Sequence, residues 1–541
     1  MQGIMQDWQL TVDKILDHAA ENHGRREIVT RSVEGPIVRT SYSELHSRAK
    51  QVSAALLDLG IKQGDRVATL AWNSARHMEC WYGAMGIGAV LHTINPRLHP
   101  EQIAWIANHA EDRILMVDTT FLPIIEGAWE HFRTLEKIIV LTDEQHMPQT
   151  SLDAVPYELW IDGQSASTPW GGFDENTACG LCYTSGTTGN PKGVLYSHRT
   201  NVLHTFMTLP PDVMNLSSAD TVLPVVPMFH ANAWGLAFSC AAVGAKMVMP
   251  GAQMDGASIY QLLNDEKVTI TAAVPTVWLM LLNHLEENNL DLPHLKRVVI
   301  GGSAVPERIL RAFEQTYDVD VVHAWGMTET SPLGTLGALP AHLVGADIES
   351  RIAYKLKQGR PPFGVELKIV DDAGKRLPRD GETSGRLMIR GLAIAAGYFK
   401  GEGGNKLDEE GYFDTGDVAT LDEMSTVQIT DRAKDVIKSG GEWISSIDLE
   451  NIAVGHPKVA NAAAIGIYHP KWDERPLLIV QPAPGETPTK EEVLAQLQGK
   501  IAKWWTPDDV AFVEEIPLGA TGKINKLKLR ETFKDYTLPT A

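Results

Sequence analysis

Short apolar runs that alternate with segments of helical periodicity constrain the fold of this chain more than any other feature. The runs have the length of buried strands, and the segments between them repeat apolar residues at helical spacing. Alternation of strands and helices over roughly 300 residues predicts an α/β fold of layered sheets with helices outside. The runs expected as strands are 67–70, 89–91, 114–117, 138–141, 246–249, 270–274 and 298–300.

Two helices are predicted from local signals. Ser41 and Glu44 have the spacing of a capping box, and apolar residues follow at helical intervals until Gly60, where we expect the helix to stop. Near the end of the chain, a second helix is predicted from Lys490 to Trp504.

The sequence pattern changes twice after residue 359. Between 359 and 431, strand runs are separated by turns that leave no room for helices, which predicts a small antiparallel β subdomain. After residue 431, strands and helices follow one another in a unit of its own, which predicts an α+β domain. At 541 residues the chain is too long for a single core. We therefore expect an N-terminal domain over 1–431, with the β-rich subdomain at 359–431, and a C-terminal domain over 432–541.

Composition and charge argue against several functions. The chain has 48 basic and 68 acidic residues, a net charge of −20, which disfavours general affinity for nucleic acid or anionic membranes. An anionic substrate therefore needs a local positive site. No apolar run approaches the ~18 residues of a membrane span, and the first ten residues lack the features of a signal peptide. The cytoplasm is the expected compartment.

The four cysteines do not predict a disulfide framework. Cys179 and Cys182 form a lone C-x-x-C pair inside an apolar run, with no second pair that would complete a zinc site. A redox role for this pair is the weaker alternative.

The segment from 183 to 193, YTSGTTGNPKG, predicts a phosphate-binding loop. Its glycines allow positive φ and close approach of the backbone to a ligand, its hydroxyls and N–H groups are donors, and Lys192 adds a positive charge. Apolar runs on either side predict two strands, so the loop would be the tip of a hairpin. A Walker A loop differs, because it places Gly-Lys-Ser/Thr between a strand and a helix. The alternative is a surface turn with an incidental lysine.

Polar groups also follow apolar runs further along the chain. His230 and Trp234 come after one such run, although a lone histidine of this kind is more often structural. Gly301 and Gly302 follow the predicted strand at 298–300, where a glycine pair suits a flat ligand that lies against the backbone. Each of these signals is weak when taken alone.

A hydroxyl and a carboxylate beside a glycine turn give a more specific signal. In the segment from 323 to 332, HAWGMTETSP, Thr328 could donate to a phosphate oxygen and Glu329 could bind Mg²⁺, which takes carboxylate oxygen readily. Asp417 follows another turn and would suit the hydroxyls of a ribose. Charges around 431–442 and Lys523 near the end of the chain would be unremarkable surface features on their own.

Together and in this order, these motifs resemble those of the adenylate-forming superfamily of acyl-CoA synthetases, luciferases and peptide-synthetase adenylation domains. The resemblance covers essentially the whole chain. Within the superfamily, the segment from 431 to 445, DRAKDVIKSGGEWIS, is similar to the medium- and long-chain fatty acyl-CoA synthetase branch.

The resemblance implies an AMP-forming ligase with two half-reactions. A carboxylate attacks the α-phosphate of ATP to give acyl-AMP and pyrophosphate, and the thiolate of coenzyme A then displaces AMP to give a thioester. The implied substrate is a short- or medium-chain carboxylate such as 3-methylmercaptopropionate. Alternatives are a long-chain fatty acyl-CoA synthetase, an enzyme that transfers the acyl group to a carrier protein, and a catalytically silent nucleotide sensor. A homodimer is also implied.

The same resemblance assigns roles to individual residues. Lys523, Glu329 and Thr328 would be catalytic, and Thr184 and Glu329 would serve Mg²⁺. Both reactants of the first step are anions, so the site needs positioned donors, lysine and metal to stabilise the charge. His230 and Trp234 would contact the acyl substrate. The residues implied to bind ATP or coenzyme A are Thr184, Ser185, Gly186, Thr187, Thr188, Gly189, Lys192, Gly302, Ser303, His323, Trp325, Gly326, Met327, Asp417, Arg432, Lys434, Lys438, Gly440, Gly441, Glu442, Trp443 and Glu474.

A mobile C-terminal domain is a further implication of the resemblance. In related enzymes this domain turns about a hinge after the first half-reaction, and Lys434 matches the hinge position. The turn would exchange Lys523 for the loop from Lys438 to Trp443 at the active site. One position departs from the family, because Ala393 stands where relatives of this branch usually carry Trp. The smaller side chain leaves a space of aromatic size, which puts full thioester formation in doubt.

Overall fold

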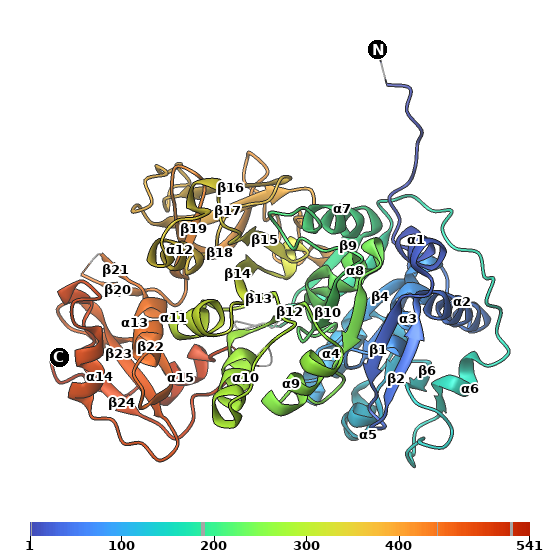
Figure 1. Cartoon of the computed structure of the whole chain (residues 1–541), viewed down its shortest axis with the longest axis horizontal. Helices are drawn as coiled ribbons and strands as arrows, with labels where there is room; N and C mark the ends of the chain where they lie inside the picture. Colours follow the sequence, from blue (N-terminus) through green and yellow to red (C-terminus); the bar gives the residue numbers. More distant parts are fainter. Residues whose placement is uncertain (2, 185–189, 441, 520–522) are drawn as a thin grey trace.

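A seven-stranded sheet is built from strands that lie between residues 66 and 197 (Figure 1). The computed structural model describes residues 1, 3–184, 190–440, 442–519 and 523–541. All neighbouring strands of this sheet are parallel except the last pair, which is the predicted hairpin on either side of the segment predicted to bind phosphate. In spatial order the strands are β7 (Ala154–Pro156), β6 (Lys137–Val140), β5 (Asp112–Val117), β3 (Arg66–Leu70), β4 (Val90–Thr93), β8 (Ala178–Tyr183) and β9 (Gly193–Ser197).

An eight-stranded sheet forms the second layer of the N-terminal region. Its inner strands are parallel, and the outermost pair at each edge is antiparallel. The strands in spatial order are β15 (Leu333–Leu336), β14 (Asp320–Gly326), β13 (Arg297–Ile300), β12 (Ile270–Ala273), β10 (Thr221–Pro224), β11 (Lys246–Met249), β1 (Glu27–Arg31) and β2 (Ile37–Ser41). The predicted α/β fold of layered sheets is therefore confirmed.

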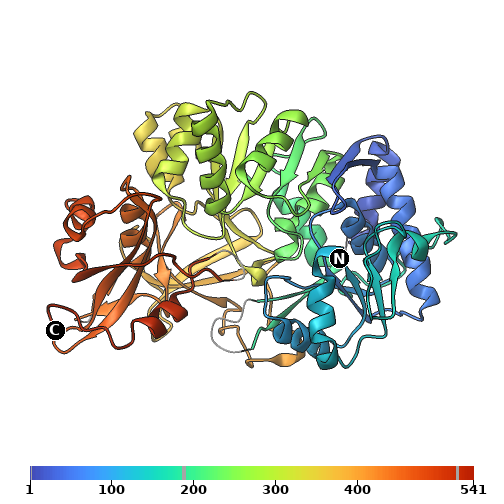
Figure 2. The ribbon, with the colours of Figure 1, turned by 90° about the horizontal axis from the view of Figure 1, so that it is seen from below.

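Helices connect and cover these two sheets (Figures 1 and 2). The predicted capping box at Ser41 and Glu44 is present at the start of α2. Within the described residues, none of the helices combines the length and apolar character needed to cross a bilayer. The helices are α1 (Asp13–His23), α2 (Tyr42–Asp58), α3 (Ala75–Gly86), α4 (Pro100–Ala110), α5 (Leu122–Ala128), α6 (Tyr157–Ile161), α7 (His198–Thr208), α8 (Leu236–Val243), α9 (Gly256–Asp265), α10 (Pro275–Asn288), α11 (Glu307–Arg311) and α12 (Ile348–Lys355).

Two smaller sheets follow. The first is a four-stranded antiparallel sheet in the order β16 (Val365–Val370), β17 (Gly385–Gly391), β18 (Phe413–Leu421) and β19 (Val427–Arg432). The second belongs to the small C-terminal domain, which lies at the opposite end of the molecule from α1 and α2 (Figures 1 and 2). Its elements are β20 (Ile437–Ser439), β21 (Glu442–Ile444), α13 (Ser446–Val454), β22 (Val459–His469), β23 (Asp473–Pro482), α14 (Lys490–Leu497), β24 (Asp509–Phe512) and α15 (Lys526–Thr532).

One helix is shorter than the sequence predicts. The segment expected as a single helix from Lys490 to Trp504 is helical only as α14, to Leu497, and a separate 3₁₀ turn covers Lys503–Trp505. The reason is local, because Gln498 is extended with a ψ of 132°, and Gly499 follows with a φ of +74°, a conformation that cannot continue a right-handed helix. The prediction of its C-terminal end was wrong.

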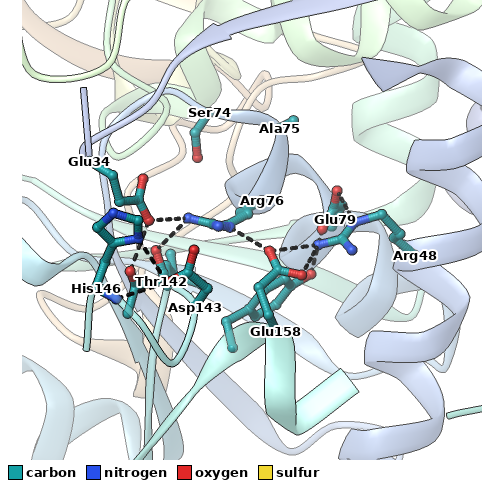
Figure 3. Close-up of polar contacts among 12 residues, drawn as sticks. Glu34, Arg48, Ser74, Ala75, Arg76, Glu79, Thr142, Asp143, His146 and Glu158 are labelled. Carbon is teal, nitrogen blue, oxygen red and sulfur yellow. Dashed lines mark hydrogen bonds and ion pairs between the residues drawn. The ribbon is translucent and has the colours of Figure 1, made fainter. Parts of the chain in front are cut away.

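A network of charged side chains ties several N-terminal elements together (Figure 3). On α2, Arg48 Nε lies 2.9 Å from Glu79 Oε1 on α3, and Arg48 Nη2 lies 3.0 Å from Glu158 Oε2 on α6. On α3, Arg76 Nε lies 2.8 Å from Glu158 Oε1, and Arg76 Nη1 lies 2.6 Å from Glu34 Oε1 between β1 and β2. Burial pulls the pKa of Glu34 upward, but Arg76 more than offsets this and the pKa lies below its usual range. Every charge in this network has a partner within the protein.

Candidate active site

A cavity of about 280 Å³ opens where the carboxyl ends of the N-terminal strands face the C-terminal domain. Residues from segments more than 300 positions apart meet there, including Thr184, Lys192 and Lys523. The lining residues are Thr184, Asn190, Lys192, Met214, His230, Ala231, Trp234, Gly301, Gly302, Ala324, Trp325, Gly326, Met327, Thr328, Glu329, Pro332, Leu333, Tyr398, Arg432 and Lys523. The structure thus brings together most of the described residues that the sequence predicts for one site.

The β8–β9 hairpin carries Thr184 and Lys192 to the cavity. The Thr184 N–H donates to the Lys192 carbonyl at 2.9 Å, and the Lys192 N–H donates to the Thr184 hydroxyl at 3.2 Å. The Lys192 ammonium lies 5.0 Å from the centre of the Tyr398 ring. Among the described residues, this ammonium has no carboxylate partner. The other predicted residues of this loop, Ser185, Gly186, Thr187, Thr188 and Gly189, lie outside the described residues.

Glu329 is held in a short turn after β14, the 3₁₀ segment Thr328–Thr330. Its side chain is buried, and its Oε1 accepts a hydrogen bond of 2.6 Å from the Tyr398 hydroxyl. Burial raises the pKa of Glu329, and the bond from Tyr398 partly offsets that rise. The backbone of the turn is fixed by Tyr196, whose hydroxyl donates to the Thr328 carbonyl at 2.7 Å. Tyr398 and Tyr196 are residues that the sequence reasoning missed, and neither has a local signal that marks it.

The donor set around Glu329 fits Mg²⁺. Magnesium in nucleotide sites usually takes one or two carboxylates together with substrate phosphates, rather than a cage of protein ligands. Within the part of the chain that the structure describes, no group of three or more His, Cys, Asp or Glu side chains gathers to hold a metal. Glu329 and Thr184 line the same cavity and carry oxygen donors of the kind that the smaller site would use.

The opposite part of the cavity is built from glycines, an aromatic ring and an ion pair. Gly302 has a φ of +85°, and an added Cβ there would lie 3.1 Å from Val274. The Trp325 indole donates to Asp417 Oδ2 at 2.9 Å, and Arg432 Nε lies 2.8 Å from Asp417 Oδ1. Asp417 is buried and does not line the cavity, so in this structure it orients Trp325 and Arg432.

The segment that carries Trp234 has an uncommon backbone. Residues Ala231 to Trp234 all have φ between +45° and +56°, and Gly235 follows at +77°. Left-handed conformations cost non-glycine residues free energy, and such strain gathers at functional sites. This turn brings the Trp234 ring so close to Gly301 that an added Cβ there would lie 3.0 Å from it. Beside it, burial and then the charges of Lys523 and Arg97 lower the pKa of His230 to about 4.

Lys523 reaches the cavity from the C-terminal domain, three residues before α15. Burial, followed by the charge of Arg432, lowers its pKa from 10.5 to about 8, against the opposing effects of Asp417 and Glu329. Helix α15 is fixed by ion pairs, because Lys526 Nζ lies 2.7 Å from Glu450 Oε1 and Arg530 Nη1 lies 2.8 Å from Asp435 Oδ1. The position of Lys523 therefore depends on the packing of the whole small domain.

Ser303 and His323, which are also predicted near the nucleotide, do not line the cavity either. Ser303 is exposed beside it, and His323 is buried in β14, where its Nδ1 lies 3.1 Å from the Leu356 carbonyl. Burial lowers the pKa of His323 to about 4, so its ring is neutral near pH 7. His323 supports the strand ends that carry the site.

The residues predicted for coenzyme A lie away from the cavity. Lys438 and Gly440 follow the turn at Lys434, and Glu442 and Trp443 form the edge strand β21 (Figure 1). The Lys438 N–H donates to Glu474 Oε2 at 2.9 Å. Gly441 lies outside the described residues. Lys523 lines the cavity in this structure, and none of the described residues of the segment from 438 to 443 does.

Ala393 is buried at 1% exposure, on the segment that packs against the Glu329 turn. Its carbonyl accepts a bond of 2.8 Å from the Ser331 hydroxyl, and the neighbouring Ala395 N–H donates to the Glu329 carbonyl at 2.8 Å. The effect of Ala393 on thioester formation stays a prediction.

This fold and cavity, with a small C-terminal domain that places Lys523 on the same cavity as Thr184 and Lys192 of the β8–β9 hairpin, are those of an adenylate-forming enzyme. Residues 16–399 match the family described as AMP-binding enzyme, and residues 448–523 match the AMP-binding enzyme C-terminal domain. The chain therefore belongs to the AMP-binding enzyme family, which confirms the superfamily that its motifs predict.

Relatives of known name are similar over nearly the whole chain. The chain is 49% identical to 3-methylmercaptopropionyl-CoA ligase of Ruegeria lacuscaerulensis, over 99% of each chain. It is 47% identical to medium-chain-fatty-acid–CoA ligase of Ectopseudomonas oleovorans, over 99% of this chain and 98% of the relative. The crystal structure of the anthranilate CoA ligase AuaEII in complex with anthranoyl-AMP matches with a TM-score of 0.87 and 26% identity, over 99% of each chain.

Proposed function

We propose that the protein is an ATP-dependent acyl-CoA ligase that works through an acyl-AMP intermediate. The observation that carries this proposal is the convergence of Lys192, Glu329 and Lys523 on one cavity. The identity of 49% with a 3-methylmercaptopropionyl-CoA ligase over the full length supports the same reaction. The carboxylate and ATP give acyl-AMP and pyrophosphate, and coenzyme A then gives acyl-CoA and AMP.

The first half-reaction brings a carboxylate oxygen against the α-phosphorus of ATP, and the bond from that phosphorus to the pyrophosphate oxygen breaks. Negative charge grows on the phosphate oxygens and on the leaving pyrophosphate. In our proposal Lys523 stabilises the charge at the α-phosphate and carboxylate, and Lys192 stabilises the leaving group. Thr328 would donate to the α-phosphate, and Glu329 with Thr184 would hold Mg²⁺, whose charge would lower the repulsion between the two anions.

The second half-reaction needs access for coenzyme A. We propose that the chain divides into domains at 1–431 and 432–541, with Lys434 as the hinge. Turning about this hinge would withdraw Lys523 and bring the segment from Lys438 to Trp443 to the cavity. Lys434 is exposed in a turn whose Arg432 carbonyl accepts from Asp435 N–H at 2.8 Å, so the proposed hinge lies at the surface. The arrangement described above corresponds to the first half-reaction, since Lys523 lines the cavity.

The acyl substrate in our proposal is a short- or medium-chain carboxylate such as 3-methylmercaptopropionate. Met214, Trp234 and Leu333 line the apolar part of the cavity and would contact the acyl chain. The two relatives above, named for 3-methylmercaptopropionyl-CoA and for medium-chain fatty acids, support this size range. Another relative, which is 44% identical, is named for long-chain fatty acids. A long-chain fatty acid is therefore the second candidate for the acyl substrate.

A panel of carboxylates tests the proposal. Purified enzyme is given ATP, Mg²⁺ and acetate, 3-methylmercaptopropionate, butyrate or octanoate, with or without coenzyme A, and AMP, pyrophosphate and thioester are measured. We expect thioester and AMP in equal amounts, with the highest kcat/KM for 3-methylmercaptopropionate or butyrate. Absence of carboxylate-dependent pyrophosphate release from the whole panel would refute ligase activity. Pyrophosphate release without thioester would instead favour transfer to a carrier protein.

We also propose a cytoplasmic enzyme that acts as a homodimer. All four cysteines are free and buried, which fits a reducing compartment. Family relatives are often dimers, and sedimentation velocity at micromolar concentration tests the assembly directly. A single species with the mass of one 59.4 kDa chain would contradict it.

A further inference from the structure

A glycine-rich loop over residues 399–406, here called the 399–406 loop, packs beside the hairpin that carries Lys192. Its sequence, FKGEGGNK, ends in Lys406. None of the site residues predicted from the sequence lies in this loop. It follows Tyr398, which already contacts Glu329 and Lys192.

The loop is anchored to the elements around the phosphate-binding segment. An added Cβ at Gly193 would lie 3.0 Å from Phe399, so the start of the loop touches the hairpin directly. Lys400 Nζ lies 2.7 Å from Glu111 Oε1, just after α4. Glu402 Oε1 lies 3.4 Å from His109 Nε2 on α4. These contacts hold the loop in place. The carboxylates of Glu111 and Glu402 are already paired in them, with Lys400 and His109.

Two lysines converge at Gly403. An added Cβ at this residue would meet Lys406 Nζ at 3.1 Å and Lys192 Nζ at 3.2 Å, so the two ammonium groups are at most about 6.3 Å apart. Gly403 also has a φ of +72°, which favours glycine. The glycine thus leaves the space in which a second cation approaches Lys192.

Like charges at this separation repel each other unless an anion lies between them. Within the described residues, neither ammonium has a carboxylate partner, whereas Lys400 in the same loop is paired. Two unpaired cations that approach each other, one from the hairpin and one from an anchored loop, are typical of a site for a multiply charged anion.

We propose that Lys406 is a second binding residue for the β- and γ-phosphates of ATP, and for the pyrophosphate formed from them, beside Lys192. This inference rests on the proposed function, because it assigns Lys406 to the leaving group of the first half-reaction. The carboxylate oxygen forms its bond to the α-phosphorus, the electron pair of the broken bond goes to pyrophosphate, and Lys406 and Lys192 share its charge. AMP lacks these phosphates, so Lys406 contributes nothing to its binding.

Binding of magnesium pyrophosphate and of AMP to Lys406→Ala, measured by isothermal titration calorimetry without turnover, tests the inference. We expect the Kd for pyrophosphate to rise about 10- to 100-fold, the range for loss of a hydrogen bond to a charged group, and the Kd for AMP to stay unchanged. Lys406→Arg should retain most of the affinity. Lys400→Ala is the matched control, because it removes a lysine of the same loop that faces Glu111, and it should bind both ligands normally.

Three outcomes would overturn the assignment. Unchanged pyrophosphate binding by Lys406→Ala is the first, and equal loss of AMP and pyrophosphate, which indicates a purely structural role, is the second. The third is failure of Lys406→Arg to bind pyrophosphate while its thermal stability is normal. These results are separable from failure of the proposed function, which would show as absence of carboxylate-dependent pyrophosphate release by the unmodified enzyme.

Discussion

Two groups of charged side chains in this protein differ in whether they are paired within the protein. In the N-terminal network of Figure 3, Arg48 and Arg76 each contact two carboxylates at 2.6 to 3.0 Å. At the cavity, Lys192 has no carboxylate partner among the described residues, nor does Lys406, which approaches Lys192 at Gly403, and Lys523 has a pKa lowered to about 8. In the network, each charged side chain is neutralised by another side chain of the protein. At the cavity, positive charge remains that a bound anion would neutralise.

The difference separates residues that stabilise the fold from residues that stabilise a ligand. Removing one partner of a buried ion pair leaves an uncompensated charge and destabilises the folded state. Removing an unpaired cation instead relieves repulsion between positive charges in the folded state. The affinity for the anionic ligand is what such a variant loses. Net charge alone gives no hint of this, because the chain as a whole carries −20.

The largest effect is expected from a change that touches neither group of charges. Lys434→Pro restricts the backbone at the hinge and should reduce thioester formation to background, while carboxylate-dependent pyrophosphate release stays near the normal rate. Lys434→Ala, which removes the same side chain but keeps backbone freedom, is the control and should form thioester much faster than Lys434→Pro. Normal overall turnover by Lys434→Pro, measured as acyl-CoA formed, would contradict the proposal that Lys434 is the hinge.

Breaking the paired network should cost stability and spare the chemistry. We expect Arg76→Met to lower the free energy of unfolding by about 2 to 3 kcal/mol, which is below the range for fully buried pairs because the Arg76 side chain is 24% exposed. Urea denaturation measures this change, and kcat below the transition should stay unchanged. The matched site variant, Lys192→Ala, should change unfolding by no more than about 0.5 kcal/mol. Equal destabilisation by the two variants would contradict the distinction between charges that stabilise the fold and charges that bind a ligand.

The pH dependence of the first half-reaction should follow Lys523. Its ammonium is charged below about pH 8, so kcat/KM for ATP should be level there and fall by roughly tenfold per unit well above it. Stability should move the other way, because the unfolded chain holds this proton up to about pH 10.5 and folding therefore gains stability between the two values. Lys523→Arg should keep whatever activity it has level to higher pH, since guanidinium does not titrate in this range. An identical decline in that variant would exclude Lys523 as the titrating group.

Local sequence signals predicted much of the fold and part of the site. The capping box at Ser41 and the β8–β9 hairpin are confirmed because backbone chemistry within a few residues decides them. The end of α14 was missed because Gln498 is extended and Gly499 adopts positive φ there. Tyr398 and Lys406 had no signal, since only the folded chain brings them beside Glu329 and Lys192. The left-handed turn before Trp234 was likewise unpredictable from alanines that favour other conformations.

The two half-reactions of Lys523→Ala, measured separately, test the central claim most directly. The first assay follows carboxylate-dependent pyrophosphate release, and the second follows conversion of supplied acyl-AMP and coenzyme A to thioester. We predict that the first rate falls ~10²- to 10³-fold, as for loss of one preorganised donor, and that the second stays within about twofold of the unmodified enzyme. Equal loss of both rates, or no loss of the first, would contradict the role assigned to this lysine and to the cavity that it completes.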